Sequence, residues 1–290
     1  MSNWFLMALG CAFFSATTAV LSKIILRTKS GLFVIWVGFV FSLPIFLIIG
    51  LYNPPVTLNA AFWKIVALLL PLELVALFLY MKALKTSPIS LIFPFLGLTP
   101  VVSILSSAVI LKERLHPLGV TGIVVVSLGA YIMNADKIKD GLLAPIKSIF
   151  KEKGIMLMIA VALIFGFTVS VGKKAVMMAG PFSFPAIYYS LYVIILTPVA
   201  LLDIFKNKVT FKKHDFLLFL AVGACFAMAI LLHFKAITLT NVSYMVAVKR
   251  VSLVFGVIYG WVIFKEKNIG FRFLGAAVML IGVLILSLAL

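Results

Sequence analysis

Two adjacent basic residues, Lys249 and Arg250, lie near the middle of a long apolar stretch. Charged side chains in apolar surroundings are costly, so each needs a partner or a function. An arginine guanidinium suits two-point binding of a carboxylate or phosphate, and a lysine ammonium offers a point contact. The pair therefore predicts a binding site for an anionic solute. The alternative is a structural ion pair with Glu73, which lies in another apolar stretch.

Glu73 and His233 are further ionisable residues that we expect at this site. Glu73 can neutralise Lys249 or Arg250, or it can take up and release protons and so couple transport to a proton gradient. His233 is either a hydrogen-bonding group between helices or a proton relay. The residue types leave both pairs of alternatives open.

Four aromatic residues with a polar edge, Trp36, Tyr188, Tyr189 and Tyr192, lie in two further apolar stretches. Such rings can stack on an organic solute and hydrogen-bond to it at the same time. Placement at a membrane interface, or plain packing, is the alternative for each of them. We take Trp36, Tyr188 and Tyr192 as candidates for the substrate site.

The sequence offers little for enzymatic or cofactor chemistry. Its 8 acidic residues are scattered, and it has neither a paired aspartate nor an HxxxD-like motif, so a membrane-embedded transferase is disfavoured. Cys11 and Cys225 indicate neither a metal site nor a disulfide. No GxxxxGK[ST] motif is present, so we expect no cofactor and no ATPase, and energy must come from a gradient. A channel is also disfavoured, because most apolar stretches lack the polar line that a pore requires.

Composition identifies the setting of these residues as a lipid bilayer. Of the 290 residues, 64% are apolar and 11% are charged, against about 45–50% and about 25% in soluble domains. The formal net charge of +17 comes mostly from basic residues between apolar runs, so we expect no nucleic-acid partner. The runs are too long and continuous for an outer-membrane barrel.

The apolar runs predict an all-α integral membrane protein with ten transmembrane helices, since each span needs roughly 20 residues. The predicted spans are 4–26, 31–52, 61–84, 88–111, 117–134, 154–178, 182–202, 215–238, 241–264 and 269–290.

The two halves of the chain repeat. A shift of 153 residues places Lys82-Ala83 on Lys235-Ala236 and Lys112-Glu113 on Lys265-Glu266, and a shift of 151 places Lys23 on Lys174. We therefore divide the chain into a first five-helix repeat (1–134), a connecting segment (135–153) and a second five-helix repeat (154–290). The spacing of apolar and lysine residues in the connection predicts an amphipathic helix on the membrane surface, with a solvated linker as the alternative. An odd number of spans per repeat makes the two repeats inverted relative to each other, which suits alternating access.

The distribution of basic residues predicts the orientation. Of the 25 Lys and Arg residues, 17 fall in or beside the odd-numbered connections and 6 in or beside the even-numbered ones. The positive-inside rule then places the odd-numbered connections in the cytoplasm and both termini on the extracytoplasmic side of the cell (inner or plasma) membrane. Because both repeats lie in one chain, a monomer can form a complete transporter.

The end of each half carries a specific motif. Ile110-Leu111-Lys112-Glu113-Arg114-Leu115, followed by Gly119, Gly122 and Gly129, resembles the end of each half in the drug/metabolite transporter superfamily of the EamA type. Ile263-Phe264-Lys265-Glu266-Lys267, with Gly275 and Gly282, is the second copy. The glycines are expected to allow close helix packing, and the Lys-Glu turn to form a cap or an interface ion pair.

This resemblance implies a secondary transporter that moves a small organic solute, anionic or zwitterionic, by alternating access. Val248-Lys249-Arg250-Val251 is similar to the ninth-helix pair of triose-phosphate translocators, where the pair binds phosphate. Leu96 stands where that branch has a further lysine, which argues against a phosphorylated sugar. The alternative function is export of neutral, amine or aromatic metabolites or drugs, with Lys249 and Arg250 structural.

Overall fold

The computed structural model describes residues 3–55, 57–132, 152–206, 213–265 and 270–288, and all regular elements within these ranges are helical. The first half contains α1 (Asn3–Ile25), α2 (Gly31–Leu51), α3 (Ala60–Thr86), α4 (Ile89–Ile92), the 3-10 helix η1 (Phe93–Gly97), α5 (Leu98–Leu111) and α6 (Pro117–Ile132). The second half contains α8 (Lys153–Ala179), α9 (Ser183–Lys206), α10 (Lys213–Ile237), α11 (Val242–Lys249), α12 (Ser252–Val262) and α13 (Gly270–Leu288).

Within these ranges, eight helical stretches are long and apolar enough to cross a membrane, with η1 counted together with α5 and α11 together with α12. Two further apolar stretches, Pro117–Ile132 and Gly270–Leu286, are shorter. The chain is therefore a multi-pass membrane protein, and all ten predicted spans coincide with helical segments. Most of the predicted connecting segment, residues 135–151, lies outside the described residues, so its amphipathic helix and the three-part division of the chain stay predictions.

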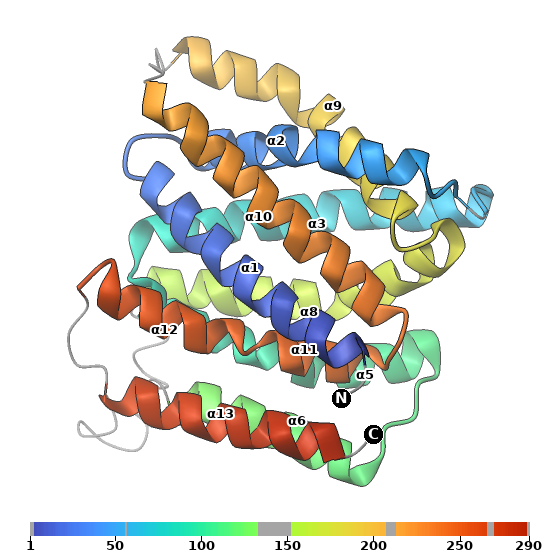
Figure 1. Ribbon diagram of the computed structural model, residues 1–290, viewed down its shortest axis with the longest axis vertical. Helices are drawn as coiled ribbons and strands as arrows, with labels where there is room; N and C mark the ends of the chain where they lie inside the picture. Colours follow the sequence, from blue (N-terminus) through green and yellow to red (C-terminus); the bar gives the residue numbers. More distant parts are fainter. Residues whose placement is uncertain (1–2, 56, 133–151, 207–212, 266–269, 289–290) are drawn as a thin grey trace.

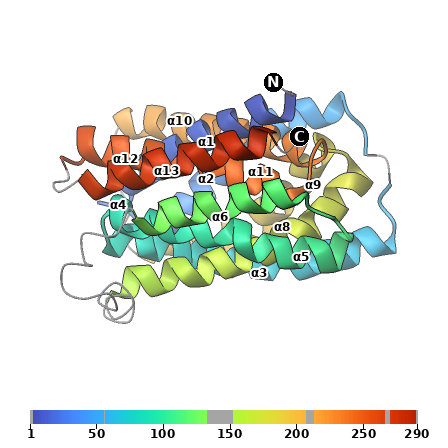
Figure 2. The ribbon, with the colours of Figure 1, turned by 90° about the horizontal axis from the view of Figure 1, so that it is seen from below.

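The helices form one bundle in which the two halves are interleaved (Figures 1 and 2). α3 packs along α8, and its counterpart α10 packs along α1. α2 packs on α9 at one end of the bundle, and α6 packs on α13 at the other (Figure 1). α1 begins and α13 ends on the same side of the bundle, which we call the terminal side (Figures 1 and 2).

Corresponding turns in the two halves have the same backbone conformation. Lys112 ends α5 with a φ of 56°, and Lys265, which follows α12 by three residues, has a φ of 52°. These are the only non-glycine residues with positive φ among the described ones. The left-handed conformation is costly for a side chain with a Cβ, so its presence at two positions 153 residues apart supports the sequence repeat.

Glycines allow α6 and α13 to pack with their backbones close together, as the sequence predicted. A Cβ at Gly129 would lie 2.6 Å from the Met279 nitrogen and 2.7 Å from the Gly275 carbonyl oxygen. A Cβ at Gly282 would lie 2.6 Å from the Val126 nitrogen. Small residues at such contacts are how helices approach each other in lipid, where no hydrophobic force drives them together.

The fourth and ninth predicted spans are each interrupted rather than continuous helices, at η1 and between α11 and α12. The fourth changes to a 3-10 helix from Phe93 to Gly97, where Pro94 supplies no backbone N–H. The ninth is broken between α11 and α12, where Arg250 N and Val251 N bond to carbonyls three residues back, Ala247 O and Val248 O. Gly97 and Arg250 are 153 residues apart, so the two breaks correspond in the repeat.

Candidate functional site

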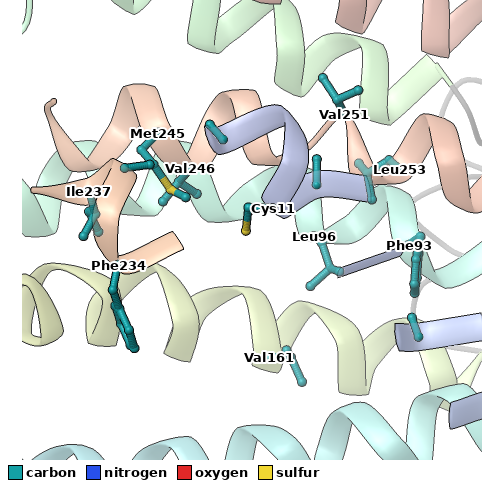
Figure 3. Packing of buried hydrophobic residues seen from close by; sticks show 14 of the residues in the cluster. Cys11, Phe93, Leu96, Val161, Phe234, Ile237, Met245, Val246, Val251 and Leu253 are labelled. Carbon is teal, nitrogen blue, oxygen red and sulfur yellow. The ribbon is translucent and has the colours of Figure 1, made fainter. Parts of the chain in front are cut away.

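A cavity of about 250 Å³ lies inside the bundle and is lined by α1, α3, α8, α9, α10 and the two interrupted spans. Figure 3 shows part of its apolar lining, to which Leu96, Phe234 and Val246 contribute from η1, α10 and α11. Its polar and charged lining residues are Ser15, Thr18, Ser22, Glu73, Tyr80, Thr99, Thr168, Lys173, Tyr188, Tyr189, Tyr192, His233, Lys249, Arg250 and Ser252. Six of the seven predicted site residues are in this set.

The break in the ninth span presents Lys249 and Arg250 to the cavity. Lys249 is the last residue of α11, and Arg250 lies in the turn before α12. The Lys249 side chain has neither a hydrogen bond nor an ion pair with any described residue, and it lines the cavity. Arg250 is 6% exposed, and its Nε has no hydrogen-bond partner in the described part of the chain. The cavity therefore contains two cations that the described residues do not neutralise directly.

Two other buried polar atoms at the cavity also lack a hydrogen-bond partner among the described residues. They are Thr99 Oγ1, at the start of α5, and His233 Nδ1, on α10. Buried polar atoms in folded proteins are nearly always hydrogen-bonded, and those that are not need an explanation. Together with Arg250 Nε, these atoms lie on three separate elements around one cavity, as expected of groups that bind a solute.

Glu73 lies on α3 and bonds to tyrosines of α9. The Tyr188 hydroxyl donates to Glu73 Oε2 at 3.1 Å and lies 3.0 Å from the Tyr192 hydroxyl. Tyr192 in turn donates to the Leu70 carbonyl oxygen at 3.4 Å. No ion pair within 4.0 Å joins Glu73 to Lys249 or Arg250 in the described residues. The structural ion pair considered from the sequence is therefore not formed, although opposite charges face one cavity.

Aromatic rings form one wall of the cavity. Phe184 stacks on Tyr188 with ring centroids 4.9 Å apart, and Tyr189 meets Phe226 edge to face at 5.2 Å. Such rings can contact the apolar body of an organic solute. Trp36 is not part of the lining: its Nε1 donates to Thr197 Oγ1 at 2.9 Å, which joins α2 to α9 away from the cavity.

A partly buried ion pair lies at the terminal side of the cavity, which Lys173 helps to line. Lys173 Nζ, at the end of α8, lies 2.7 Å from Glu113 Oε1 and donates to the Thr240 carbonyl oxygen at 2.7 Å. Glu113 Oε2 also accepts a hydrogen bond from Val242 N at the start of α11, at 2.9 Å. This set of contacts, which we call the terminal latch, joins the two halves. It confirms the prediction that the Lys-Glu turn forms an interface ion pair.

A related contact lies on the opposite side of the bundle. Lys23 of α1 donates to the Ser87 carbonyl oxygen at 2.7 Å, at the end of α3. Ser87 and Thr240 are 153 residues apart, so Lys23 has the place that Lys173 has in the second half. By this contact Lys23 corresponds to Lys173, so its alignment with Lys174 is wrong by one residue. Glu266, the counterpart of Glu113, lies outside the described residues.

Several lining residues were not predicted from the sequence. Thr99 and Thr168 are small polar residues in apolar helices, and only their place beside the cavity distinguishes them from packing residues. Tyr80 lies two turns from Glu73 on α3, a spacing that could have indicated a common face. Lys173 was not singled out from the sequence, where the repeat alignment pointed to its neighbour Lys174.

Comparisons with known proteins bear on this architecture. The model of the EamA-like transporter family matches residues 2–135 and 152–288. A solved structure described only as "Crystal structure of protein" is 16% identical, with a TM-score of 0.70 over 100% of this chain and 99% of that one. At that identity the likeness shows a shared fold alone. The comparison with curated proteins gives no match.

Proposed function

The chain belongs to the EamA-like transporter family, within the drug/metabolite transporter superfamily, and from this we propose a secondary carrier for a small organic anion or zwitterion. The observation that carries this proposal is the pair of cations at the break of the ninth span. Lys249 and Arg250 face the cavity without an ion pair in the described residues. An anion bound between them would offset the cost of holding two positive charges away from bulk water.

The size and chemistry of the cavity support a small organic solute. Its volume of about 250 Å³ is near the lower end of small-molecule sites, which span about 300–1,000 Å³. Arg250 and Lys249 offer donors to a carboxylate or phosphate, while Tyr188 and Phe184 offer aromatic surface. Glu73 faces the same cavity and could receive an ammonium group, which would suit a zwitterion.

Alternating access is the mechanism that the architecture supports best. In this proposal the ten helical segments span the membrane as two inverted five-helix repeats, with the solute at the helix breaks between them. α2 packs along α10, whereas their counterparts α9 and α3 have little backbone contact and are bridged by Tyr188 and Tyr192. A difference of this kind between equivalent contacts is what one of two alternating states requires. The terminal latch would close this state on one side.

The proposed membrane orientation follows the lysine and arginine count. The protein lies in the cell (inner or plasma) membrane. The side opposite the termini, which has most of the basic connections, faces the cytoplasm. The terminal latch then closes the extracytoplasmic side. One copy of the chain lines the whole cavity, so in this proposal the carrier works as a monomer. Transport in this proposal involves no enzymatic step.

A second candidate function is export of neutral, amine or aromatic metabolites or drugs. The aromatic wall and Glu73 favour it, because together they would bind an aromatic amine without help from Lys249 and Arg250. In that case the two cations serve only the structure of the helix break.

Counterflow in proteoliposomes tests the proposal. Vesicles are loaded with one unlabelled compound from a panel of sugar phosphates, carboxylates, amino acids, inorganic phosphate and aromatic amines, and uptake of the labelled compound is followed. We expect saturable, transient accumulation of an anion or zwitterion, which a channel does not produce. Counterflow of aromatic amines alone would support the second function and contradict the first.

A further inference from the structure

Glu73 is the only acidic residue among those that line the cavity. Its side chain lines the cavity beside the hydroxyls of Tyr188, Tyr192 and Thr168, of which Tyr188 donates to Oε2. It has no ion pair within 4.0 Å in the described chain. An ionised carboxylate in such a place is stabilised by hydrogen bonds from neighbouring hydroxyls and by the positive charge of Lys249 across the cavity. What Glu73 binds therefore depends on what else this cation holds.

The charged groups around Glu73 come from several helices. α11 and the turn after it bring Lys249 and Arg250, and α8 brings Lys173, whose charge Glu113 already neutralises. The other titratable groups are His233 on α10, Tyr80 on α3 itself, and the three tyrosines of α9, Tyr188, Tyr189 and Tyr192. On α1, Cys11 lies near Lys249 and Arg250.

The formal charges lead to a coupling between two ligands. With the cavity empty, the ionised carboxylate of Glu73 opposes two cations, which leaves one excess positive charge among the three groups. A monovalent anion bound to Lys249 and Arg250 neutralises one of their two positive charges, as the carboxylate of Glu73 does in the empty cavity. If Glu73 then gains a proton, the excess returns to one positive charge, as in the empty carrier. If a proton binds without the anion, two positive charges stand unopposed in a medium of low dielectric constant.

The hydrogen bonds around Glu73 tolerate this change. A hydroxyl can donate to a carboxylate or accept from a protonated carboxyl, so the contact between Tyr188 and Glu73 survives with its direction reversed. Tyr188 can then donate to Tyr192, which donates to Leu70 O. The bridge between α9 and α3 is thereby kept. The proton comes from water on one side of the membrane and returns to water on the other.

We propose that Glu73 binds a proton when an anion occupies Lys249 and Arg250, so that the carrier moves the anion and a proton in the same direction. This inference rests on the proposed function, because it needs an anion at the two cations. Binding coupling is reciprocal, so a proton on Glu73 raises the affinity for the anion by the same factor as the anion raises the affinity for the proton. The structure thus assigns an anion–proton symporter rather than an exchanger of anions for protons.

The test uses the anion that shows counterflow, in proteoliposomes that contain a pH-sensitive dye and have the membrane potential clamped. When the vesicle exterior is more acidic than the lumen, the wild-type carrier should accumulate the anion in the lumen at least several-fold. The lumen should become more acidic at the same time. Glu73→Gln should lose both the pH-driven accumulation and the proton movement, and its half-saturating concentration for counterflow should no longer change with pH. Glu152→Gln, a matched change outside the cavity beside the start of α8, should keep both. His233→Gln tests whether the histidine of the cavity carries the proton instead.

Each remaining outcome overturns the inference. Proton movement that survives Glu73→Gln but is lost in His233→Gln would place the proton on the histidine. Accumulation driven only by the reversed pH gradient would show exchange of anion for proton, and accumulation driven only by sodium would show a different coupling ion. Wild-type anion counterflow without proton movement would overturn symport and leave the proposed function intact. If no anion shows counterflow, the proposed function itself fails.

Discussion

Lys249 and Arg250 are adjacent, but their side chains can recognise different things. The guanidinium of Arg250 has a planar set of donors that fits two oxygens of a carboxylate, and its Nε has no partner in the described chain. The ammonium of Lys249 is a compact charge on a flexible stem and can follow an anion without fixed geometry. We therefore assign orientation of the solute to Arg250 and additional charge to Lys249.

Conservative exchange of each cation separates these roles. Arg250→Lys keeps the charge and loses the fork, so the half-saturating concentration of a transported carboxylate should rise about tenfold, which corresponds to about 1.4 kcal/mol. Lys249→Arg, the matched control, should change it less than threefold. The measurement is the concentration dependence of counterflow. Equal half-saturation of wild type and Arg250→Lys would contradict two-point binding by the guanidinium.

For single residues, the sequence indicated which types belong at the site better than it indicated which way each side chain faces. Lys249, Arg250, Glu73 and His233 were found because an ionisable group in an apolar helix needs a reason. Trp36 was expected at the site for the same physical reason as Tyr188, yet it bonds to Thr197 instead. Which side of an aromatic-rich helix faces the cavity depends on the rotation of that helix against its neighbours, and an almost uniformly apolar helix carries no pattern that fixes the rotation.

At the scale of helices, the two interrupted spans form the centre of the site. A continuous helix directs neighbouring side chains about 100° apart, whereas a turn allows Lys249 and Arg250 both to reach the cavity. The ends of most helices could be predicted to within a few residues, because a span must match the bilayer. The break at Arg250 could not, since neither glycine nor proline lies there. Only its repeat partner, beside Pro94, carries such a signal.

The glycines between α6 and α13 should matter more than glycines elsewhere. A Cβ at Gly129 would lie 2.5–2.7 Å from Met279 and Gly275 atoms, two of them backbone, so Gly129→Ala forces the helices apart. We expect a loss of about 1–3 kcal/mol, as for overpacked cores, seen as a lower midpoint of thermal unfolding in detergent. The matched control is Gly270→Ala on α13, where a Cβ meets nothing within 4 Å. Equal midpoints for both variants would show that this contact is not tight.

The whole molecule is asymmetric although its halves repeat. The terminal latch binds α5, α8 and the start of α11 through Glu113 and Lys173, and α2 packs on α10 more closely than α9 packs on α3. Repeat and family could be predicted from the sequence, because residue types recur at a fixed offset. The asymmetry could not, because residue types that recur at a fixed offset predict equivalent contacts in the two halves.

Removal of the latch should open the terminal side. Glu113→Gln leaves the charge of the partly buried Lys173 without its partner, so it should weaken the closure. The reporter is a cysteine in place of the buried cavity residue Ile237, in a chain whose Cys11 and Cys225 are alanine. Its initial rate of maleimide labelling in micelles should rise several-fold in Glu113→Gln. Asp203→Asn, a matched change on the opposite side, should leave the rate unchanged; equal rates in all three would contradict a closing role for the latch.

Counterflow of the transported anion by wild type and by Lys249→Gln/Arg250→Gln tests most directly whether these two cations bind the solute. Lys64→Gln, on the exposed surface of α3, is the control for loss of a basic residue. We expect saturable counterflow in wild type and in Lys64→Gln. The double variant should lose counterflow while its midpoint of thermal unfolding shows that it is still folded. Undiminished counterflow in the double variant would contradict a binding role for the two cations: Lys249 and Arg250 would then be structural, and the solute would be neutral, an amine or an aromatic compound.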